Sequence, residues 1–311
     1  MTTALFTHPD CLGHRTPEGH PERVDRLRAI LAALDAPAFA ALDRRAAPMG
    51  DEADILRCHP RAYLEAIRAA IPAAGSVALD PDTHVSPGSF RAALRGAGAV
   101  CAAVDAVMAG EAANAFCAIR PPGHHAETAR PMGFCLFGNV AIAAKRALDR
   151  HGLARVAVVD FDVHHGNGTQ DLLWDEARAL YVSTHQMPLY PGTGAADERG
   201  AHGNVLNLPL PPGTGGAGFR AAFEHAALPA LDAFAPEMVL ISAGFDAHRD
   251  DPLANLALTE DDFAWVTARL CDLARDHAGG RVVSALEGGY DLDALAASVA
   301  AHVAVLMERG G

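Results

Sequence analysis

The chain has 311 residues, half of them hydrophobic and 20% charged, with a formal net charge of −13 at pH 7. This length suffices for a sizeable core, and the acidic balance argues against a nucleic-acid or anionic-membrane partner, because such surfaces need a basic patch. The N-terminus lacks the features of a signal peptide, no apolar run is long enough to cross a bilayer, and the six cysteines have no Cys-x-x-Cys spacing, so we expect a cytoplasmic protein with reduced thiols.

The predicted elements begin with helices and continue as alternating strands and helices. Apolar residues on one face from Leu27 to Leu34 indicate a first helix, and the Ala-rich stretch from Ser89 to Met108 indicates a second, which ends at Gly110. Three more helices with one apolar face are expected at residues 219–226, 263–273 and 292–306, the second behind a capping box that starts at Thr259. Short apolar runs typical of buried parallel strands lie at residues 115–119, 155–160, 179–183, 238–242 and 281–286.

The order of these elements predicts the fold class. Strands that alternate with helices form a mainly parallel central sheet that is covered by helices on both faces. No low-complexity tract, linker or internal repeat divides the sequence. We therefore expect a single α/β domain over residues 1–311.

Carboxylates, imidazoles and a phenol follow the five predicted strands. In open α/β sheets, ligands bind outside the carboxyl ends of the strands, which meet at one edge of the sheet. The sequence therefore predicts a functional site at this edge. The polar residues that follow the strands are, in chain order, His124-His125, Asp160-Phe-Asp162-Val-His164, Thr184-His185, Asp246 and Tyr290.

The segment from Asp160 to His164 is the most informative of these. On an extended chain, residues two apart point the same way, so Asp162 and His164 can both reach one ion. A third ligand from Asp246 leaves a fourth position for water, as in catalytic zinc sites. A hydrogen-bonded structural network at the strand end is the alternative, but the polar clusters at neighbouring strand ends favour a metal site.

The histidine pair and the tyrosine supply the other groups that a hydrolytic metal site needs. His124 and His125 follow a rigid Pro-Pro-Gly turn, and an imidazole can accept the proton of an activated water. Tyr290 follows two glycines and is a candidate donor to a developing oxyanion, or else a packing residue of a loop.

Taken together, these segments resemble the histone deacetylase family within the arginase–deacetylase superfamily. The resemblance covers nearly the whole chain and is closest to the class II branch and its bacterial relatives, which include acetylpolyamine amidohydrolases. The motifs that carry it occur in the family's order: Gly19-His-Pro-Glu-Arg23, Arg120-Pro-Pro-Gly-His-His125, Gly133-Phe-Cys135, Asp160-Phe-Asp-Val-His-His-Gly-Asn-Gly-Thr-Gln170, Pro191-Gly-Thr-Gly194, Ser242-Ala-Gly-Phe-Asp246 and Glu287-Gly-Gly-Tyr290.

The resemblance implies an arginase–deacetylase-like fold and zinc-dependent removal of acyl groups from lysine side chains or similar amines. One catalytic zinc would be bound by Asp162, His164 and Asp246. The resemblance makes His125 the general base and acid, His124 an electrostatic partner and Tyr290 the group that polarises the amide carbonyl. Asn167 would be the partner of His125, and Asp160 the partner of His124.

The resemblance also implies residues around this centre. Gly133, Phe134 and Tyr190 would line a narrow channel for the acyl-amine stem, and Arg23 would belong to an internal channel for acetate release. Asp82 is a candidate rim carboxylate for the peptide backbone. A structural potassium ion would be held by Asp160, Asp162, His164, Ser183 and Thr184.

Three other functions stay open, and Leu253 bears on the first of them. In polyamine-selective members of this family an acidic gatekeeper stands at the position of Leu253, so this leucine favours an acyl-lysine peptide over an acetylpolyamine, although Asp250 and Asp251 lie close by. A dinuclear manganese hydrolase of the arginase kind would need additional ligands, and a catalytically silent scaffold would be expected to lose a ligand, the histidine pair or the tyrosine. The sequence leaves a homo-oligomer open.

Overall fold

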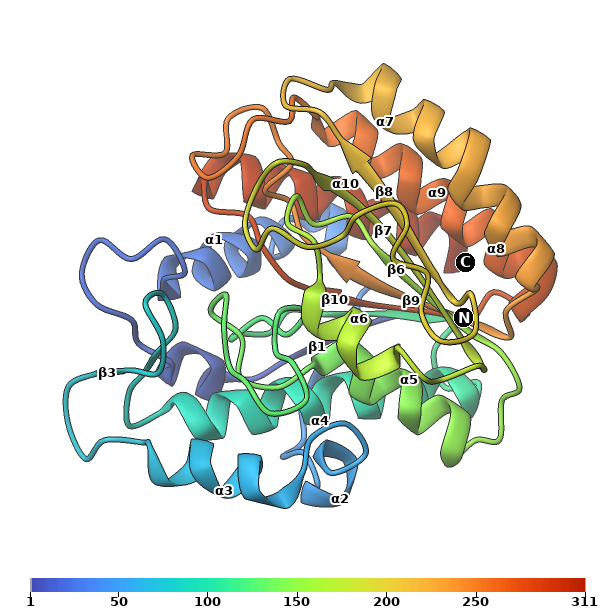
Figure 1. Ribbon diagram of the computed structural model, residues 1–311. Coiled ribbons are helices and arrows are strands. Elements are labelled where there is room, and N and C mark those ends of the chain that lie inside the picture. Colours follow the sequence, from blue (N-terminus) through green and yellow to red (C-terminus); the bar gives the residue numbers. More distant parts are fainter. Residues whose placement is uncertain (1, 311) are drawn as a thin grey trace.

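The computed structural model describes residues 2–310, and an eight-stranded sheet forms its centre (Figure 1). The strand order is β2-β1-β5-β10-β9-β6-β7-β8, and every neighbouring pair is parallel. A separate antiparallel pair joins β3 (Val77–Ala78) and β4 (His84–Val85). The strands of the main sheet are β1 (Thr3–Thr7), β2 (Asp43–Ala46), β5 (Asn114–Cys117), β6 (Val156–Asp160), β7 (Ala179–Gln186), β8 (Val205–Leu210), β9 (Met238–Ala243) and β10 (Val282–Leu286).

Helices cover both faces of the sheet (Figure 1). One face carries α2 (Glu52–Ile55), α3 (Arg61–Ala69), α4 (Ser89–Met108), α5 (Asn139–Asp149) and α6 (Asn167–Leu173). The other carries α1 (Val24–Leu34), α7 (Gly216–Ala222), α8 (Leu228–Phe234), α9 (Glu260–Ala278) and α10 (Leu292–Gly310). A π-helical turn at Phe223–Ala227 joins α7 to α8, and short 3₁₀ helices lie at Pro9–Gly13 and Pro37–Phe39.

The helices on each face of the sheet pack against it in a hydrophobic core, so the protein has two cores. One packs α4 and α5 against one face of the sheet, and the other packs α1, α9 and α10 against the opposite face. The inner strands β5, β6, β9 and β10 are buried along their whole length. Burial on both faces explains why each of them is a continuous apolar run in the sequence.

The parallel α/β fold and its main elements were predicted correctly. Each of the five expected strands is present, and α4 begins and ends where its sequence pattern places it. The capping box at the start of α9 is also confirmed, because the backbone N–H of Thr259 donates to Asp262 Oδ2 at 3.0 Å. Gly110 was expected at the end of α4, and it lies directly after the C-cap of this helix with a left-handed φ of 71°.

Three strands of the sheet were missed, and two of them lie at its edges. The strand β2 is polar and alternates between half-buried and exposed residues, and β8 contains Pro209. Edge strands keep one side free for solvent, so they tolerate polar residues and proline and lack a continuous apolar signal. The third, β1, is a buried inner strand whose sequence begins and ends with threonine.

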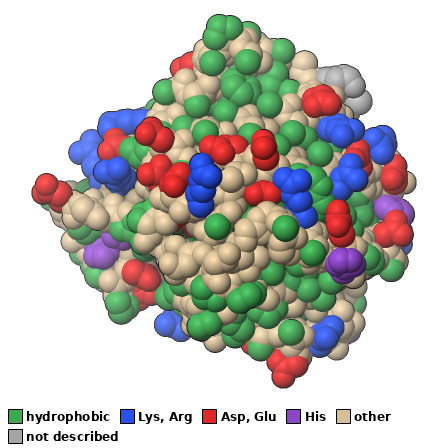
Figure 2. All heavy atoms as spheres, turned by 90° about the horizontal axis from the view of Figure 1, so that it is seen from above, with side chains coloured by type: hydrophobic (Ala, Val, Ile, Leu, Met, Phe, Trp, Pro, Cys, Tyr) green, Lys and Arg blue, Asp and Glu red, His purple; other side chains and the backbone are tan. Residues whose placement is uncertain are grey.

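The charged side chains of the surface are mixed in sign. On the face shown in Figure 2, basic and acidic side chains are interspersed. Many of them pair, as in Arg269 with Asp272 at 2.8 Å. Exposed pairs contribute only about 0–1 kcal/mol each, so the two cores supply most of the stability. Among residues 2–310, no helix has the length and apolar character needed to cross a bilayer.

Candidate active site

Asp162, His164 and Asp246 converge at the carboxyl ends of β6 and β9. His164 Nδ1 lies 3.2 Å from Asp162 Oδ1 and 3.1 Å from Asp246 Oδ2. All three residues are buried, and one donor atom from each lies within 4.8 Å of the others. The strand β6 ends at Asp160, so Asp162 and His164 come together on a bend rather than on the extended chain that their spacing suggested.

Backbone groups fix the two carboxylates of this cluster. Gly288 N donates to Asp162 Oδ2 at 2.8 Å, and Val163 N donates to Asp246 Oδ1 at 2.9 Å. A side chain on Gly288 would clash, because its Cβ would lie 2.0 Å from Asp246 Oδ2. The glycine of the segment after β10 is therefore required for its backbone to approach the cluster.

The cluster attracts positive charge. Burial alone would lower the pKa of His164, but its hydrogen bonds to Asp162 and Asp246 raise that pKa to about 10. One imidazole nitrogen and two carboxylates form a donor set that zinc accepts, and three protein ligands are typical of catalytic sites with an open position. These residues fit a divalent metal ion and are consistent with zinc.

The hydrogen bonds of His125 fix which of its nitrogens carries the proton. His125 Nδ1 lies 2.8 Å from Asn167 Oδ1, and Asn167 Nδ2 donates to Glu127 Oε1 at 2.8 Å. Because an amide oxygen only accepts, Nδ1 of His125 is the protonated nitrogen and Nε2 keeps its lone pair. Burial, together with the neighbouring His124 and His164, holds the pKa of His125 well below its usual range.

His124 has the opposite environment. Its Nδ1 lies 3.1 Å from Asp160 Oδ2, and its Nε2 lies 3.7 Å from Asp162 Oδ2. Burial would lower the pKa of His124, but these two carboxylates outweigh it and raise that pKa well above the usual range. The rings of His124 and His125 are 4.0 Å apart, so a cationic and a neutral imidazole lie side by side.

The turn before the histidine pair is held by Glu287. Its Oε2 accepts hydrogen bonds from Gly123 N at 2.6 Å and from His124 N at 3.1 Å. Burial raises the pKa of Glu287 to about 7. Glu287 belongs to the Glu287-Gly-Gly-Tyr290 motif, but its role was not predicted; it fixes the backbone of the opposite loop.

Tyr290 is placed by contacts with its backbone and with its ring. Its N–H donates to Asp251 Oδ2 at 2.7 Å, and the Arg26 guanidinium lies 4.8 Å from the centre of its ring. Arg26 also donates to the backbone carbonyl oxygens of Glu287 and Gly289. Burial raises the pKa of the Tyr290 hydroxyl well above its usual range, so this hydroxyl stays protonated and can donate.

A cavity of about 260 Å³ leads from the surface to this group of residues. Gly133 has a left-handed φ of 55°, and a Cβ at this position would lie 2.3 Å from His125 Cδ2, so only glycine lets the wall approach the imidazole. Aromatic rings form much of the remaining wall, as expected for a site that holds an aliphatic chain. The lining residues are Asp82, His125, Gly133, Phe134, His164, Leu189, Tyr190, Leu253 and Tyr290.

A buried cluster of charges lies behind the site. Glu22 is fully buried, and its carboxylate contacts Arg120 Nη2 at 2.6 Å and Arg26 Nη1 at 3.1 Å. His14 Nε2 lies 3.3 Å from the same carboxylate. Burial would raise the pKa of Glu22, but Arg120 and His14 hold it well below its usual range. This cluster ties the N-terminal segment to the loop that carries the histidine pair and, through Arg26, to Tyr290.

Comparison with known proteins decides the family. The profile of the histone deacetylase domain matches residues 20–306. This chain belongs to the histone deacetylase family. It is 44% identical to a histone deacetylase-like amidohydrolase of Pseudomonas aeruginosa, over 88% of this chain and 73% of that protein. It is 38% identical to a probable deacetylase of Archaeoglobus fulgidus, over 94% of this chain and 82% of that protein.

A solved structure agrees with this assignment. A crystal structure of the HDA15 HD domain superimposes with a TM-score of 0.94 at 37% identity, covering 99% of this chain and 88% of that one. As a member of the histone deacetylase family with an Asp-His-Asp metal-binding cluster, the protein is a hydrolase of the deacetylase and amidohydrolase type.

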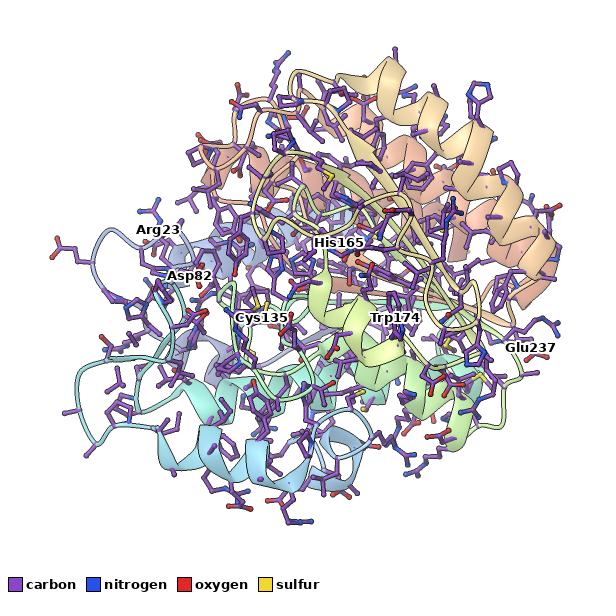
Figure 3. All side chains as sticks on the ribbon, in the orientation of Figure 1. Arg23, Asp82, Cys135, His165, Trp174 and Glu237 are labelled. Carbon is purple, nitrogen blue, oxygen red and sulfur yellow. The ribbon has the colours of Figure 1, made fainter. Side chains whose placement is uncertain are left out.

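Arg23, which was expected to belong to an internal channel, does not lie inside the protein. Arg23 is exposed at the start of α1, and in Figure 3 it lies at the outer edge of the molecule. The arginine that reaches the site is Arg26, which is fully buried and lies about one helical turn further on. The expectation for Arg23 was wrong because sequence alone does not show which of two neighbouring arginines faces the interior.

Several other expected residues lie close to the metal-binding cluster or line the cavity. Asp82 lines the cavity from the loop between β3 and β4, and its Oδ1 accepts a hydrogen bond from Gly133 N at 3.2 Å. Asp160 and Ser183 are paired in register across β6 and β7, next to Thr184. Leu189 also lines the cavity but was not predicted as a site residue. Its position directly before Tyr190 was the one signal for it in the sequence.

Proposed function

We propose that this protein is a zinc-dependent deacylase that removes acetyl or other acyl groups from lysine side chains or similar amines. The observation that carries this proposal is the cavity itself. Its wall presents the neutral imidazole of His125 and the hydroxyl of Tyr290 beside the Asp162, His164 and Asp246 cluster. The cavity has a volume of about 260 Å³ and a largely aromatic wall, which suits an unbranched aliphatic stem that ends in an amide.

One zinc ion would be held by Asp162, His164 and Asp246, where it would supply a Lewis acid for the amide carbonyl and lower the pKa of water. Among the described residues, one cluster has three metal-donor side chains whose donor atoms lie within 4.8 Å of one another. A single cluster favours one ion over the dinuclear manganese alternative. The presence of the full donor set, the histidine pair and the tyrosine also disfavours a catalytically silent scaffold.

The histidines would carry the proton transfers. His125 accepts a proton at Nε2 as water attacks and returns it to the leaving amine, while Asn167 keeps the imidazole in the required tautomer. His124, held cationic by Asp160, would stabilise negative charge that develops beside it. A neutral base beside a fixed cation gives each imidazole one role.

Tyr290 would donate its hydroxyl proton in a hydrogen bond to the carbonyl oxygen as charge builds on it. Asp251 and Arg26 fix the backbone and ring of this tyrosine, so the donor is in place before the reaction starts. Such preorganised donors act most strongly on the transition state. The walls formed by Gly133, Phe134, Tyr190 and Leu253 would hold the substrate stem, and Asp82 would bind the backbone of a peptide at the rim.

The role expected for Arg23, in an internal channel for acetate release, falls to Arg26 in this proposal. Its guanidinium binds two backbone carbonyl oxygens behind Tyr290, so we propose that it positions the tyrosine and faces the route by which acetate leaves. Arg23 has no part in this role.

We further propose a structural potassium ion held by Asp160, Asp162, His164, Ser183 and Thr184. Support comes from Thr184 Oγ1, which is buried and has no hydrogen-bond partner in the described part of the chain. One eight-stranded sheet and the two cores on its faces extend through the described residues, which supports a single catalytic domain over residues 1–311.

A substrate panel with metal analysis tests the proposed function. Acetyl-lysine peptides, acetylated polyamines and longer acyl-lysines should reveal turnover that is lost with a chelator and restored by zinc. Failure of every acylated amine in zinc-loaded protein would contradict the proposal. A preference for acetylpolyamines would retain the hydrolase but change its substrate.

A further inference from the structure

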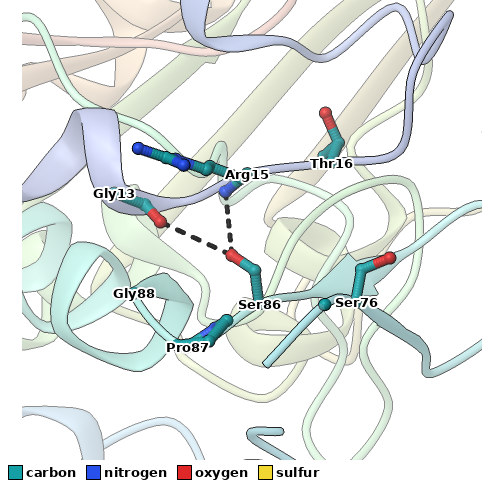
Figure 4. A pocket seen from close by; sticks show the side chains of 8 residues that line it. Gly13, Arg15, Thr16, Ser76, Ser86, Pro87 and Gly88 are labelled. Atoms are coloured by element: carbon teal, nitrogen blue, oxygen red, sulfur yellow. Dashed lines mark hydrogen bonds between the residues drawn. The ribbon is translucent and has the colours of Figure 1, made fainter. Parts of the chain in front are cut away.

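A groove runs along the surface from one side of the cavity mouth. It consists of two adjoining hollows of about 340 Å³ and about 550 Å³, which share Arg15 and Thr16 in their walls. The smaller hollow includes His20 and Arg23, and the larger includes Ser76 and Ser86 (Figure 4). Neither hollow contains a residue of the proposed catalytic site.

His20 connects this groove to the mouth of the catalytic cavity. Its ring lies 4.8 Å from the ring of Phe134 in an edge-to-face contact, and its Nε2 lies 2.9 Å from the carbonyl oxygen of Asp82. Phe134 and Asp82 both line the catalytic cavity. A chain that leaves the cavity on this side therefore passes His20 and enters the groove.

The walls of the groove are fixed before anything binds. Arg15 N donates to Ser86 Oγ at 2.9 Å, and Ser86 Oγ donates to Gly13 O at 3.4 Å, as Figure 4 shows. The two segments touch so closely that a Cβ on Gly88 would lie 2.2 Å from Gly13 O. A preformed surface loses little conformational entropy when a ligand docks.

The charge of the groove comes from two arginines without carboxylate partners. Within residues 2–310, neither Arg15 nor Arg23 has an acidic side chain within 4.0 Å, whereas the nearby Arg28 pairs with Asp25 at 3.1 Å. Glu18 is the one remaining acidic side chain in these walls, so the two free guanidinium groups exceed it. Two free cations are notable in a chain whose net charge is −13.

Two further carboxylates, on the loop between β3 and β4, accept hydrogen bonds within the protein. Asp82 Oδ1 accepts hydrogen bonds from Gly133 N and Thr83 Oγ1, and Asp80 Oδ1 accepts from Asp82 N and Thr83 N. More distant acidic residues are screened, because the Debye length is about 8 Å at physiological ionic strength. The walls of the groove themselves contain three arginines and two carboxylates, an excess of one positive charge, and the unpaired cations among them are Arg15 and Arg23.

We propose that this groove binds the polypeptide on one side of the acyl-lysine and selects substrates that carry an acidic side chain in that flank. The inference rests on the proposed function and names the substrate class as acyl-lysine in a polypeptide. The exposed hydroxyl group of Ser76 offers a hydrogen bond to a peptide backbone, Thr16 Oγ1 donates to Glu22 O at 2.7 Å but can still accept one, and the arginines offer partners for a carboxylate. A polyamine would meet two repelling cations instead.

A peptide series with a single glutamate tests this directly. Acetyl-lysine peptides that carry one glutamate, or glutamine of the same shape, at each of three positions on either side are compared by kcat/KM. We expect glutamate to be favoured by about threefold to tenfold, mainly through KM, at positions on one flank only. The effect is one-sided because the groove lies on one side of the mouth.

Variants assign the effect to the groove. In Arg15→Ala and Arg23→Ala, the glutamate-to-glutamine ratio should fall toward one, and in Arg15→Glu it should fall below one. Because both peptides are measured on the same variant, losses of folding or of chemistry cancel in this ratio. Arg249→Ala removes the same charge from an exposed position on the loop after β9 and should keep the wild-type ratio.

The outcomes separate the groove from the catalytic proposal. A wild-type ratio of one at every position, or a preference on both flanks that persists in the Arg15→Ala/Arg23→Ala double variant, would overturn the groove. A capped acetyl-lysine without flanking residues serves as the reference substrate. If this reference and all peptides resist hydrolysis, the proposed function fails and the groove falls with it, whereas hydrolysis with equal ratios overturns the groove alone.

Discussion

Asp251 Oδ2 accepts a hydrogen bond of 2.7 Å from the backbone N–H of Tyr290, and Asp251 Oδ1 accepts one of 3.0 Å from Leu253 N. One buried carboxylate therefore fixes two walls of the catalytic cavity, which come from the loops after β9 and β10. The neighbouring Asp250 is exposed, with 61% of its side-chain surface accessible.

Asp251→Asn should lower both stability and turnover. An amide has one acceptor oxygen, so one of the two backbone N–H groups loses its partner in the interior, at a cost of about 1–3 kcal/mol. The displaced tyrosine should lower kcat by about 10- to 100-fold. Urea unfolding and steady-state kinetics measure both effects. Asp250→Asn is the matched control and should change the free energy of unfolding by less than about 0.5 kcal/mol; equal behaviour of the two variants would argue against this role of Asp251.

The purified protein should contain one zinc ion per chain, bound by Asp162, His164 and Asp246. Elemental analysis of the wild type and of Asp246→Ala measures this, and the variant should lose both metal and turnover, because it removes one of three ligands. Asp250→Ala removes a nearby exposed carboxylate and should keep the metal. Two equivalents of manganese in the active enzyme, or full activity of Asp246→Ala, would contradict a single zinc site.

Tyr290→Phe should retain the fold and the metal but lose most of the turnover. The loss of one oxyanion donor typically lowers kcat by about 100- to 1000-fold. The ring contact with Arg26 and the backbone bond to Asp251 do not involve the hydroxyl, so the unfolding transition should change little. Turnover close to that of the wild type would show that Tyr290 only packs against the cavity wall.

Leu253 should make the protein prefer acetyl-lysine peptides to acetylpolyamines. It contributes an uncharged side chain to the cavity wall, so kcat/KM should be higher for acetyl-lysine peptides than for acetylspermidine. Leu253→Glu should shift this ratio toward the polyamine, and Leu253→Gln controls for the change of shape without charge. The gatekeeper argument fails if the wild type prefers acetylpolyamines by about an order of magnitude, a tenfold ratio that corresponds to about 1.4 kcal/mol.

His302 should make stability depend on pH. It is fully buried between Thr267 Oγ1 at 2.7 Å and Ser284 Oγ at 2.9 Å, and burial lowers its pKa to about 3. The unfolded chain, with a histidine pKa of about 6.5, then binds the proton more strongly. The stability from neutral His302 is present above about pH 6.5 and is lost as the pH falls toward 3.

Between pH 7 and pH 5 this effect amounts to about 2 kcal/mol. Urea unfolding of the wild type and of His302→Gln at both pH values measures it, because glutamine does not titrate. The wild type should lose more stability than the variant by this amount. The same substitution at His202, which is exposed on the surface, controls for the removal of a histidine. Equal pH dependence of wild type and His302→Gln would contradict the buried neutral state.

The sequence predicted the interior of the sheet and the catalytic edge because both have strong local signals. Buried parallel strands are continuous apolar runs, and the polar residues that follow them meet at one edge whatever the details of the loops. The metal cluster could be predicted for the same reason, although Asp162 and His164 converge on a bend.

The supporting residues could not be predicted in this way. Glu22, Arg26 and Arg120 are charged, and charged residues normally lie on the surface, so nothing in the local pattern indicates that all three are fully buried. Their burial depends on partners distant in the sequence, such as the Arg120 and Glu22 pair. The prediction for Arg23 failed because the burial of Arg26, and not of Arg23, depends on how α1 packs against the rest of the protein.

The N–H groups that hold Asp162 and Asp246 belong to the backbone of Gly288 and Val163. An alanine scan leaves every such donor in place, so it reports on the side chain at these positions and not on the hydrogen bond itself. Val163→Ala would report the loss of two buried methyl groups from the core, while Gly288→Ala would report a steric clash. Replacement of single amides by esters, through chemical ligation or suppression with hydroxy acids, would be needed to measure what these two bonds contribute to metal affinity.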